Sequence, residues 1–334
     1  MSCLEYISTD KFIYENEIRP YLPSRIFDAH VHLQIPQFHP HLEEQLPLTK
    51  APLFNQIDMA AIHSWWKTLF PAIDVRGLIL AMPTAGCDMS GINKFNSQHI
   101  DSHRERFSIL TGPQFSDNEL EEQVKTLKPH GLKPYMFFSM LENYNDSRIT
   151  DFLPESQIAI ADKYGLSITL HLAKTRGLAD KVNLNEINRL VKSYPNVNFI
   201  LAHCGRCFIA PNMDAALEQL IVAPNLWLDT SAVCDTGVFL HLFSRYDRKQ
   251  ILFGTDLVTA SGFRGTYVRM GMSWDWSVES SVRRQGGQDV RATFAVYENL
   301  CAIMTAARFC CFDMSEYNDL FYANANRIFQ LEQK

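Results

Sequence analysis

Histidines and an aspartate stand at the ends of several apolar segments of this chain, where they could act together. His30 and His32 alternate in DAHVHL, His171 follows SITL, His203 ends NFILAH, and Asp256 ends QILFGTD. Alternate residues of a strand project from the same face, so the imidazoles of His30 and His32 would project together. Imidazole and carboxylate groups that converge in this way can bind a divalent metal ion. Burying them without a partner would cost several kcal/mol each.

Short apolar runs, rich in β-branched residues, provide the strands that would position these side chains. Stretches with helical spacing separate them, at intervals close to one βα unit of roughly 30 residues. The predicted strands are 25–33, 75–82, 107–112, 131–137, 166–172, 197–203, 226–231 and 250–255. Strictly alternating strands and helices indicate a parallel sheet, and eight repeats favour a closed (β/α)8 TIM barrel. The glycine-rich phosphate turn typical of the rival open sheet is missing after the first strand.

We expect residues 1–334 to form one barrel domain with an N-terminal extension, 1–24, and a final helix, 316–330. Two long insertions, 34–74 and 257–312, follow the first and last strands and should lie on the active face. Residues 261–266, rich in glycine and polar side chains, are expected to form a flexible loop. Both insertions contain a pair of tryptophans, namely Trp65 and Trp66, and Trp274 and Trp276. These aromatics either cover a subdomain core or an interface, or contact a ligand.

Composition excludes several classes of protein. The chain has a net charge of −6 and no long basic run, so nucleic acid is not an expected partner. No segment approaches the ~20 continuous apolar residues of a membrane span, and the N-terminus does not read as a signal peptide. Eight cysteines without framework spacing indicate reduced thiols in a cytoplasmic protein. A small molecule is the expected substrate, and the aromatic insertions leave a homodimer open.

The chain resembles the amidohydrolase superfamily, and more closely its amidohydrolase-related (amidohydrolase 2) branch of metal-dependent hydrolases and decarboxylases. The resemblance rests on DAHVHL, LHLA, LAHCGR, LFGTD and the terminal YANANRIF. It implies that His30, His32, His171 and Asp256 bind one divalent metal, most often zinc, with manganese as the alternative. His203 would then be a ligand of a second metal site or an unligated acid/base group.

Lys133 and Arg206 are candidates for substrate binding. Binuclear members of the superfamily carry a carboxylated lysine on the fourth strand, so a carboxylated Lys133 would imply a second metal. Single-metal members of the related branch often keep a lysine or arginine there to meet the substrate, and we favour this role. Arg206 could bind a substrate carboxylate with two parallel hydrogen bonds, although a capping or surface role is equally open.

The predicted reaction is hydrolysis of an ester, lactone or amide carbonyl of a small molecule by a metal-activated water. Asp256 would take the proton of that water, and His203 would stabilise the oxyanion or protonate the leaving group. The alternative is non-oxidative decarboxylation of a small, possibly aromatic, carboxylic acid, since the resemblance also reaches aminocarboxymuconate-semialdehyde and resorcylate decarboxylases. Those enzymes usually show an H-G-G-type signature after the sixth strand. His203-Cys204-Gly205-Arg206 departs from it and favours hydrolysis.

Overall fold

The computed structural model of the chain describes residues 5–258, 261–277 and 292–331. Eight parallel strands lie in the order β1-β2-β3-β4-β5-β6-β7-β8, with helices between them. The strands are β1 (Arg25–Leu33), β2 (Asp74–Ala81), β3 (Arg106–Thr111), β4 (Gly131–Pro134), β5 (Ser167–Leu170), β6 (Asn198–Leu201), β7 (Leu226–Asp229) and β8 (Ile251–Leu252). All eight predicted strands are therefore present.

Backbone hydrogen bonds between the first strand and the segment that follows the last one close the sheet into a barrel. The amide of Ala29 donates to the carbonyl of Phe253, and the amide of Asp256 donates to the carbonyl of His30, both at 2.8 Å. The amide of His32 donates to the carbonyl of Leu257 at 2.8 Å. The structure thus confirms the predicted TIM barrel.

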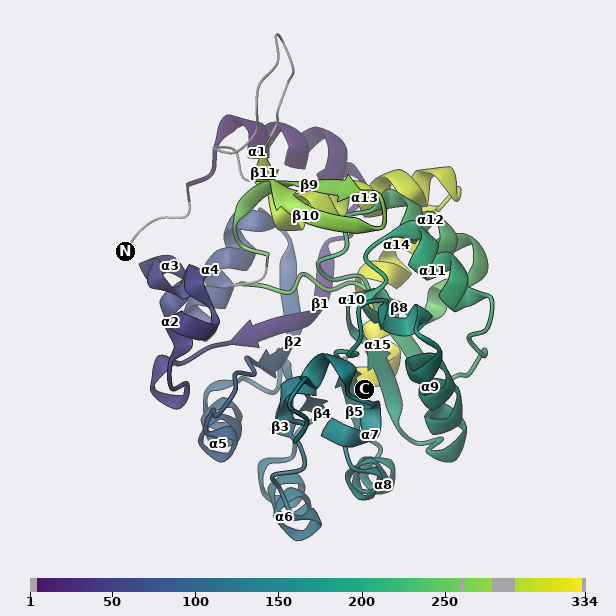
Figure 1. Cartoon of the computed structure of the whole chain (residues 1–334). Helices are drawn as coiled ribbons and strands as arrows, with labels where there is room; N and C mark the ends of the chain where they lie inside the picture. The colour runs from purple at the N-terminus through teal and green to yellow at the C-terminus, as the bar shows by residue number, and fades with distance from the viewer. Residues whose placement is uncertain (1–4, 259–260, 278–291, 332–334) are drawn as a thin grey trace.

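The helices cover the outside of the barrel (Figure 1). They are α1 (Ser8–Ile13), α2 (Leu42–Gln45), α3 (Pro52–Asn55), α4 (Met59–Leu69), α5 (Met89–His99), α6 (Asp117–Leu127), α7 (Ile149–Phe152), α8 (Glu155–Tyr164), α9 (Lys181–Ser193), the short segment α10 (Ala202–Arg206), α11 (Ala210–Leu217), α12 (Thr236–Arg245), α13 (Ala295–Phe309), α14 (Met314–Asn318) and α15 (Asn324–Phe329). The predicted final helix consists of α14 and α15 joined by a π-helical turn, Asp319–Ala323.

Helix α9 illustrates why these segments are helical. Leu184, Ile187 and Leu190 recur at a helical period, and all three are buried. The carboxylate of Asp180 accepts a hydrogen bond from the amide of Val182 at the N-terminus of the helix. One apolar stripe therefore packs on the barrel while the opposite face stays polar.

The two insertions have different structures. Trp65 and Trp66 lie on α4 and are buried in the core, where the indole of Trp66 donates to Asp28 at 3.1 Å. The second insertion contains β9 (Arg264–Met270), β10 (Ser273–Ser277), β11 (Thr293–Phe294) and α13. Strands β9 and β10 form an antiparallel hairpin that lies beside α1 and α13 (Figure 1). The expectation of a loop over 261–266 is wrong from Arg264 onward, because these residues pair with β10 and β11.

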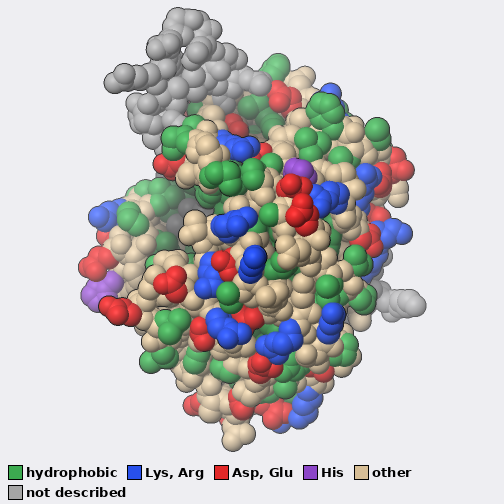
Figure 2. All heavy atoms as spheres, turned by 45° about the vertical axis from the view of Figure 1, so that its right-hand side comes forward, with side chains coloured by type: hydrophobic (Ala, Val, Ile, Leu, Met, Phe, Trp, Pro, Cys, Tyr) green, Lys and Arg blue, Asp and Glu red, His purple; other side chains and the backbone are tan. Residues whose placement is uncertain are grey.

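Acidic and basic side chains are interspersed on the face shown in Figure 2, without a continuous basic stripe. Among the described residues, no helix combines the length and the apolar character needed to traverse a lipid bilayer.

Candidate metal centre

Two histidines on β1 present unprotonated nitrogens to each other. Nδ1 of His30 lies 2.8 Å from Oδ2 of Asp229, and Nδ1 of His32 lies 3.2 Å from the carbonyl of Ala81. Carboxylate and carbonyl oxygens only accept hydrogen bonds, so both Nδ1 atoms must carry the proton. In the neutral imidazoles, both Nε2 atoms then hold lone pairs, and these atoms are 3.1 Å apart.

The carboxylate of Asp256 lies next to the Nε2 atoms of His30 and His32 and adds oxygen lone pairs to theirs. Asp256 follows β8 in a left-handed backbone conformation, with φ of 61°. Its Oδ1 lies 3.5 Å from Nε2 of His30 and 3.3 Å from Nε2 of His32. These separations match ligand atoms that share a tetrahedral zinc, which are about 3.3 Å apart when each bond is about 2.0–2.1 Å long. The residues present therefore fit a divalent cation.

Burial keeps this cluster in the protonation states that favour a cation. Desolvation lowers the pKa of His30, although Asp229 and Asp256 oppose the shift. Burial alone would raise the pKa of Asp256, but the His203, His30 and His32 side chains hold it well below its ordinary value. At neutral pH His30 is therefore a neutral imidazole beside the charged carboxylate of Asp256.

His203 faces the other oxygen of this carboxylate. Its Nε2 lies 3.9 Å from Oδ2 of Asp256, and the ligand atoms of His30, His203 and Asp256 all lie within 4.8 Å of one another. Nδ1 of His203 lies 3.2 Å from the carbonyl of Ser231, so its Nε2 also presents a lone pair to the site. Burial lowers the pKa of His203 to about 4.

His171 lies on the side of the site where His203 is found. Its ring is 5.2 Å from the ring of His203 and 4.6 Å from the ring of Tyr135, measured between centroids. Nδ1 of His171 is buried and has no hydrogen-bond partner among the described residues. The group whose ligand atoms lie within 4.8 Å of one another thus contains His203 and not the expected His171, although both residues border the same cavity.

Lys133 and Arg206 lie behind the wall of the cavity. The Lys133 side chain on β4 is fully buried, its Nζ has no hydrogen-bond partner among the described residues, and burial lowers its pKa to about 8. Nη1 of Arg206 donates to the carbonyl of Leu172 at 2.7 Å. Neither residue is among the described residues that line the cavity.

The cavity above the cluster has a volume of about 300 Å³. Aromatic and apolar side chains form most of its upper wall, and Trp274 and Trp276 come from the hairpin. Its lining consists of His30, His32, Leu46, Met82, Pro83, Tyr135, His171, His203, Phe208, Ala232, Asp256, Trp274 and Trp276. Trp274 packs on Phe208 at 4.6 Å between ring centroids, so the hairpin tryptophans belong to the cavity wall.

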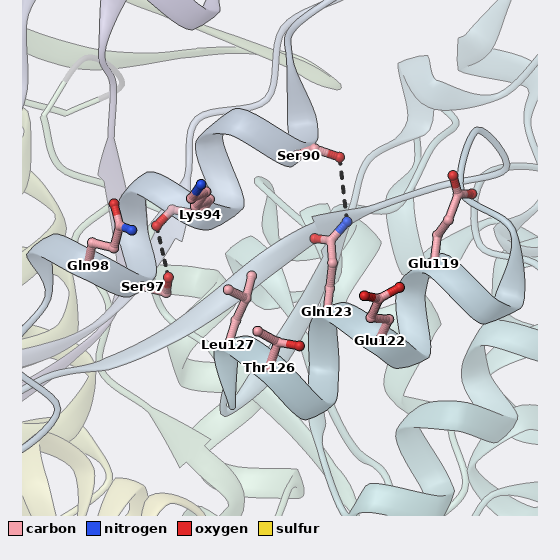
Figure 3. A pocket seen from close by; sticks show the side chains of 9 residues that line it. All are labelled: Ser90, Lys94, Ser97, Gln98, Glu119, Glu122, Gln123, Thr126 and Leu127. Atoms are coloured by element: carbon pink, nitrogen blue, oxygen red, sulfur yellow. Dashed lines mark hydrogen bonds between the residues drawn. The ribbon is translucent and has the colours of Figure 1, made fainter.

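A second pocket, of about 410 Å³, lies between α5 and α6 on the outside of the barrel (Figure 3). Lys94 and Gln98 on α5 face Glu122 and Gln123 on α6 across it. No histidine or cysteine is among its described lining residues, so it does not compete with the first cavity as a metal site.

Sequence reasoning missed Asp229, the last residue of β7. This carboxylate contacts His30, accepts from the amide of His203 at 2.9 Å and accepts from the amide of Ser231 at 3.0 Å. It therefore fixes the orientation of two histidines at once. The predicted strand 226–231 ran past Asp229, whereas β7 ends at this residue, so the rule that selected Asp256 did not apply to it in LWLDTS.

Comparison with known proteins identifies a family for most of the chain. The profile of the family described as amidohydrolase matches residues 99–331, which is more than half of the chain and excludes β1. A search of curated proteins found no match.

Solved structures with the same fold include both hydrolases and decarboxylases. A protein from Acinetobacter baumannii, assigned as a 2-pyrone-4,6-dicarboxylic acid hydrolase and crystallised with citric acid, is 14% identical with a TM-score of 0.58, over 91% of this chain and 99% of that chain. A Pseudomonas putida protein assigned to the same activity is 14% identical with a TM-score of 0.57, over 94% and 100%. The 2,6-dihydroxybenzoate decarboxylase from Rhizobium is 13% identical with a TM-score of 0.53, over 93% and 100%.

Proposed function

The chain belongs to the amidohydrolase family, and we propose that it is a metal-dependent hydrolase that cleaves an ester, lactone or amide bond of a small molecule. The family generally uses a divalent metal, and its neighbours of similar fold include a hydrolase and a decarboxylase. The proposal selects the first of these two reactions and assigns roles to the residues of the cavity.

One observation carries the proposal, namely the convergence of electron pairs around Asp256. Nε2 of His30, Nε2 of His32 and Oδ1 of Asp256 lie 3.1–3.5 Å from one another, while Nδ1 of each histidine faces an oxygen acceptor outside this group. The nitrogen lone pairs and the carboxylate charge repel one another unless a cation lies between them. We assign His30, His32, His171 and Asp256 to this cation, with zinc as the expected metal.

The remaining chemistry follows from the position of each side chain. When bound, a divalent cation polarises a carbonyl oxygen and lowers the pKa of water. Asp256 accepts a proton from the attacking water, because its Oδ2 faces away from His30 and His32 and towards His203. Nε2 of His203, which presents a lone pair towards Oδ2 of Asp256, takes over this proton, and the imidazolium then stabilises the developing negative charge or protonates the leaving group. Lys133 does not line the cavity, but its buried amine lies over the ring of Tyr135 in the cavity wall, and we keep it as the candidate that attracts an anionic group of the substrate.

The wall of the cavity indicates the shape of the substrate. Tyr135, Phe208, Trp274 and Trp276 line it, and stacking on aromatic side chains favours flat, unsaturated rings. The same wall also supports a second candidate function, non-oxidative decarboxylation of an aromatic carboxylic acid. The two reactions yield different products and can be separated directly.

The test combines metal analysis with a substrate screen. Protein purified without added metal is expected to contain about one equivalent of zinc per chain. Aryl esters, lactones and amides are assayed for hydrolysis, and hydroxylated benzoates are assayed for release of carbon dioxide. Hydrolysis without carbon dioxide release supports the proposal, and the reverse result selects the second candidate.

Asp256→Asn tests the mechanism. Loss of the general base should lower kcat by about 10²–10⁴-fold, with unchanged far-UV circular dichroism. Asp275→Asn, on the exposed surface of β10, is the matched control and should keep native activity. Full turnover in Asp256→Asn would overturn the assignment of Asp256.

A further inference from the structure

The turn that carries His203 has an uncommon backbone conformation. His203, Cys204, Gly205 and Arg206 have φ of 55°, 51°, 66° and 59°, which makes one left-handed helical turn. L-residues other than glycine avoid this conformation, because Cβ comes too close to the following carbonyl. Three of these four residues are not glycine, so contacts from other elements must hold the turn in place.

Two polar side chains hold the turn, one at each end. The amide of His203 donates to Asp229 at 2.9 Å. At the other end, Nη1 of Arg206 donates to the carbonyls of Leu172 at 2.7 Å and Lys174 at 3.4 Å. Leu172 directly follows His171, so the Arg206 guanidinium joins the end of the β6 segment to the end of the β5 segment.

The surroundings leave the turn little freedom. A Cβ added to Gly177 would lie 2.3 Å from the carbonyl oxygen of Gly205 and 2.8 Å from Cβ of Arg206, so these backbones are in close contact. Nε of Arg206 is buried without a hydrogen-bond partner among the described residues. Nη1 is directed at main-chain carbonyls, and Arg206 is not among the described residues that line the cavity.

We infer that Arg206 is a positioning residue, which fixes the left-handed His203 turn to the backbone beside His171, and that it is not the ligand of a substrate carboxylate. Loss of the guanidinium would let the turn relax towards right-handed conformations and move the His203 imidazole away from Asp256. The geometry of His171 would change as well, because Leu172 loses its hydrogen-bond partner.

The experiment compares Arg206→Lys and Arg206→Ala with native protein. Hydrogen exchange of metal-free protein is measured first, because it depends on neither substrate nor metal. Amides of residues 203–206 and 172–174 should exchange at least 10-fold faster in both variants. Arg176→Ala, an exposed arginine of the neighbouring loop, is the control and should exchange like native protein.

Two further measurements separate positioning from substrate binding. The affinity for Co²⁺ should fall about 10- to 100-fold, as for other residues that orient metal ligands, with an altered visible spectrum of the bound Co²⁺. Millimolar guanidinium should restore both properties in Arg206→Ala. If that variant does not fold, Arg206→Lys decides the question by the same measurements.

The kinetic readout rests on the proposed hydrolysis, whereas hydrogen exchange does not, so failure of either proposal can be recognised. Positioning predicts an equal fall in kcat for an uncharged ester and for its carboxylated analogue. A rise in KM confined to the carboxylated ester, with native hydrogen exchange and Co²⁺ affinity, would overturn the inference. Native behaviour of both variants in all three measurements would overturn it too.

Discussion

At the scale of single residues, the identity of a hydrogen-bond partner decides which histidine nitrogen can bind a cation. The carboxylate of Asp229 and the carbonyl of Ala81 accept from Nδ1 of His30 and His32, which leaves both Nε2 atoms unprotonated. The proposed metal centre would therefore depend on residues that do not bind the metal themselves. Asp229 matters most, because it also holds the backbone of His203.

Replacing Asp229 by Asn should exchange an acceptor for a donor without changing the size of the side chain. Its new amide would donate to Nδ1 of His30, the imidazole proton would move to Nε2, and that atom could no longer bind a cation. We expect the dissociation constant for Zn²⁺, measured by competition with a chromophoric chelator, to rise about 10- to 100-fold.

Ser231→Ala is the matched control for this prediction. Ser231 donates to Asp229, and its Oγ also lies 2.9 Å from Nδ1 of His203 and 3.3 Å from Nδ1 of His30. Its removal leaves the carboxylate that holds the proton on Nδ1 of His30, so the affinity for Zn²⁺ should change much less. Equal affinity of Asp229→Asn and native protein would show that Asp229 does not control the tautomer of His30.

Spacing and strand ends were sufficient to predict His30, His32, His203 and Asp256 as neighbours, because parallel strands of a barrel end at one rim. The orientation of each ring was not predictable. His203 and Asp256 adopt positive φ although neither is glycine, and no local pattern in the sequence indicates a left-handed residue there. Long-range contacts, such as that from Asp229 to the amide of His203, impose these conformations.

At the scale of elements, the strands were predicted in the correct order but several were predicted too long. The segment 197–203 was expected to be extended to its end, yet β6 stops at Leu201 and the left-handed turn begins at His203. The residues that follow the last hydrogen-bonded position of such a strand are still apolar, because they remain buried after they leave the sheet. The sequence pattern therefore does not mark the end of the strand.

The hairpin of the second insertion is the element through which substrate preference can be tested. Trp274 lines the cavity and packs on Phe208, and the hydroxyl of Tyr267 on β9 donates to the carbonyl of Phe208 at 3.1 Å. Composition alone could not separate this tryptophan pair from Trp65 and Trp66, since both pairs are aromatic residues of long insertions. Only the fold shows that one pair is in the core and the other is at the cavity.

Trp274→Ala should weaken the binding of ring-containing substrates. Loss of one aromatic stacking partner is worth about 0.5–1.5 kcal/mol, so KM for an aryl ester should rise up to roughly 10-fold. KM for a short aliphatic ester should change less. Met272→Ala, at the tip of the hairpin where the side chain is 65% exposed, is the control. Equal effects of Trp274→Ala on both esters would rule out a stacking role.

At the scale of the whole molecule, the interior contains titratable groups that the fold keeps uncharged. His39 is 4% exposed, its Nδ1 lies 2.8 Å from Oγ1 of Thr84, and burial lowers its pKa to about 4. Burial, followed by the charge of Arg106, also lowers the pKa of His130 to about 4. At these two positions the native state therefore binds fewer protons than the unfolded chain across the mildly acidic range.

This difference sets the direction of the pH dependence. Above the unfolded pKa of 6.5 both states hold neutral histidines, so the stability is fully present. Below pH 6.5 this histidine is protonated in the unfolded chain but stays neutral in the native state. The free energy of unfolding therefore falls until the pH reaches about 4. For His39 alone the loss is on the order of 3 kcal/mol, which follows from the size of the shift.

Urea unfolding of metal-free protein between pH 7.5 and pH 4 measures this loss, since the metal ligands then contribute no bound cation. His39→Asn places an amide nitrogen near the position of Nδ1 and removes the titration, so the variant should lose less stability than native protein over the same range. His41→Asn is the control, because His41 is exposed and its Nδ1 lies 3.4 Å from the carboxylate of Glu44. If His39→Asn and native protein lose stability in parallel, protonation of His39 does not contribute to acid unfolding.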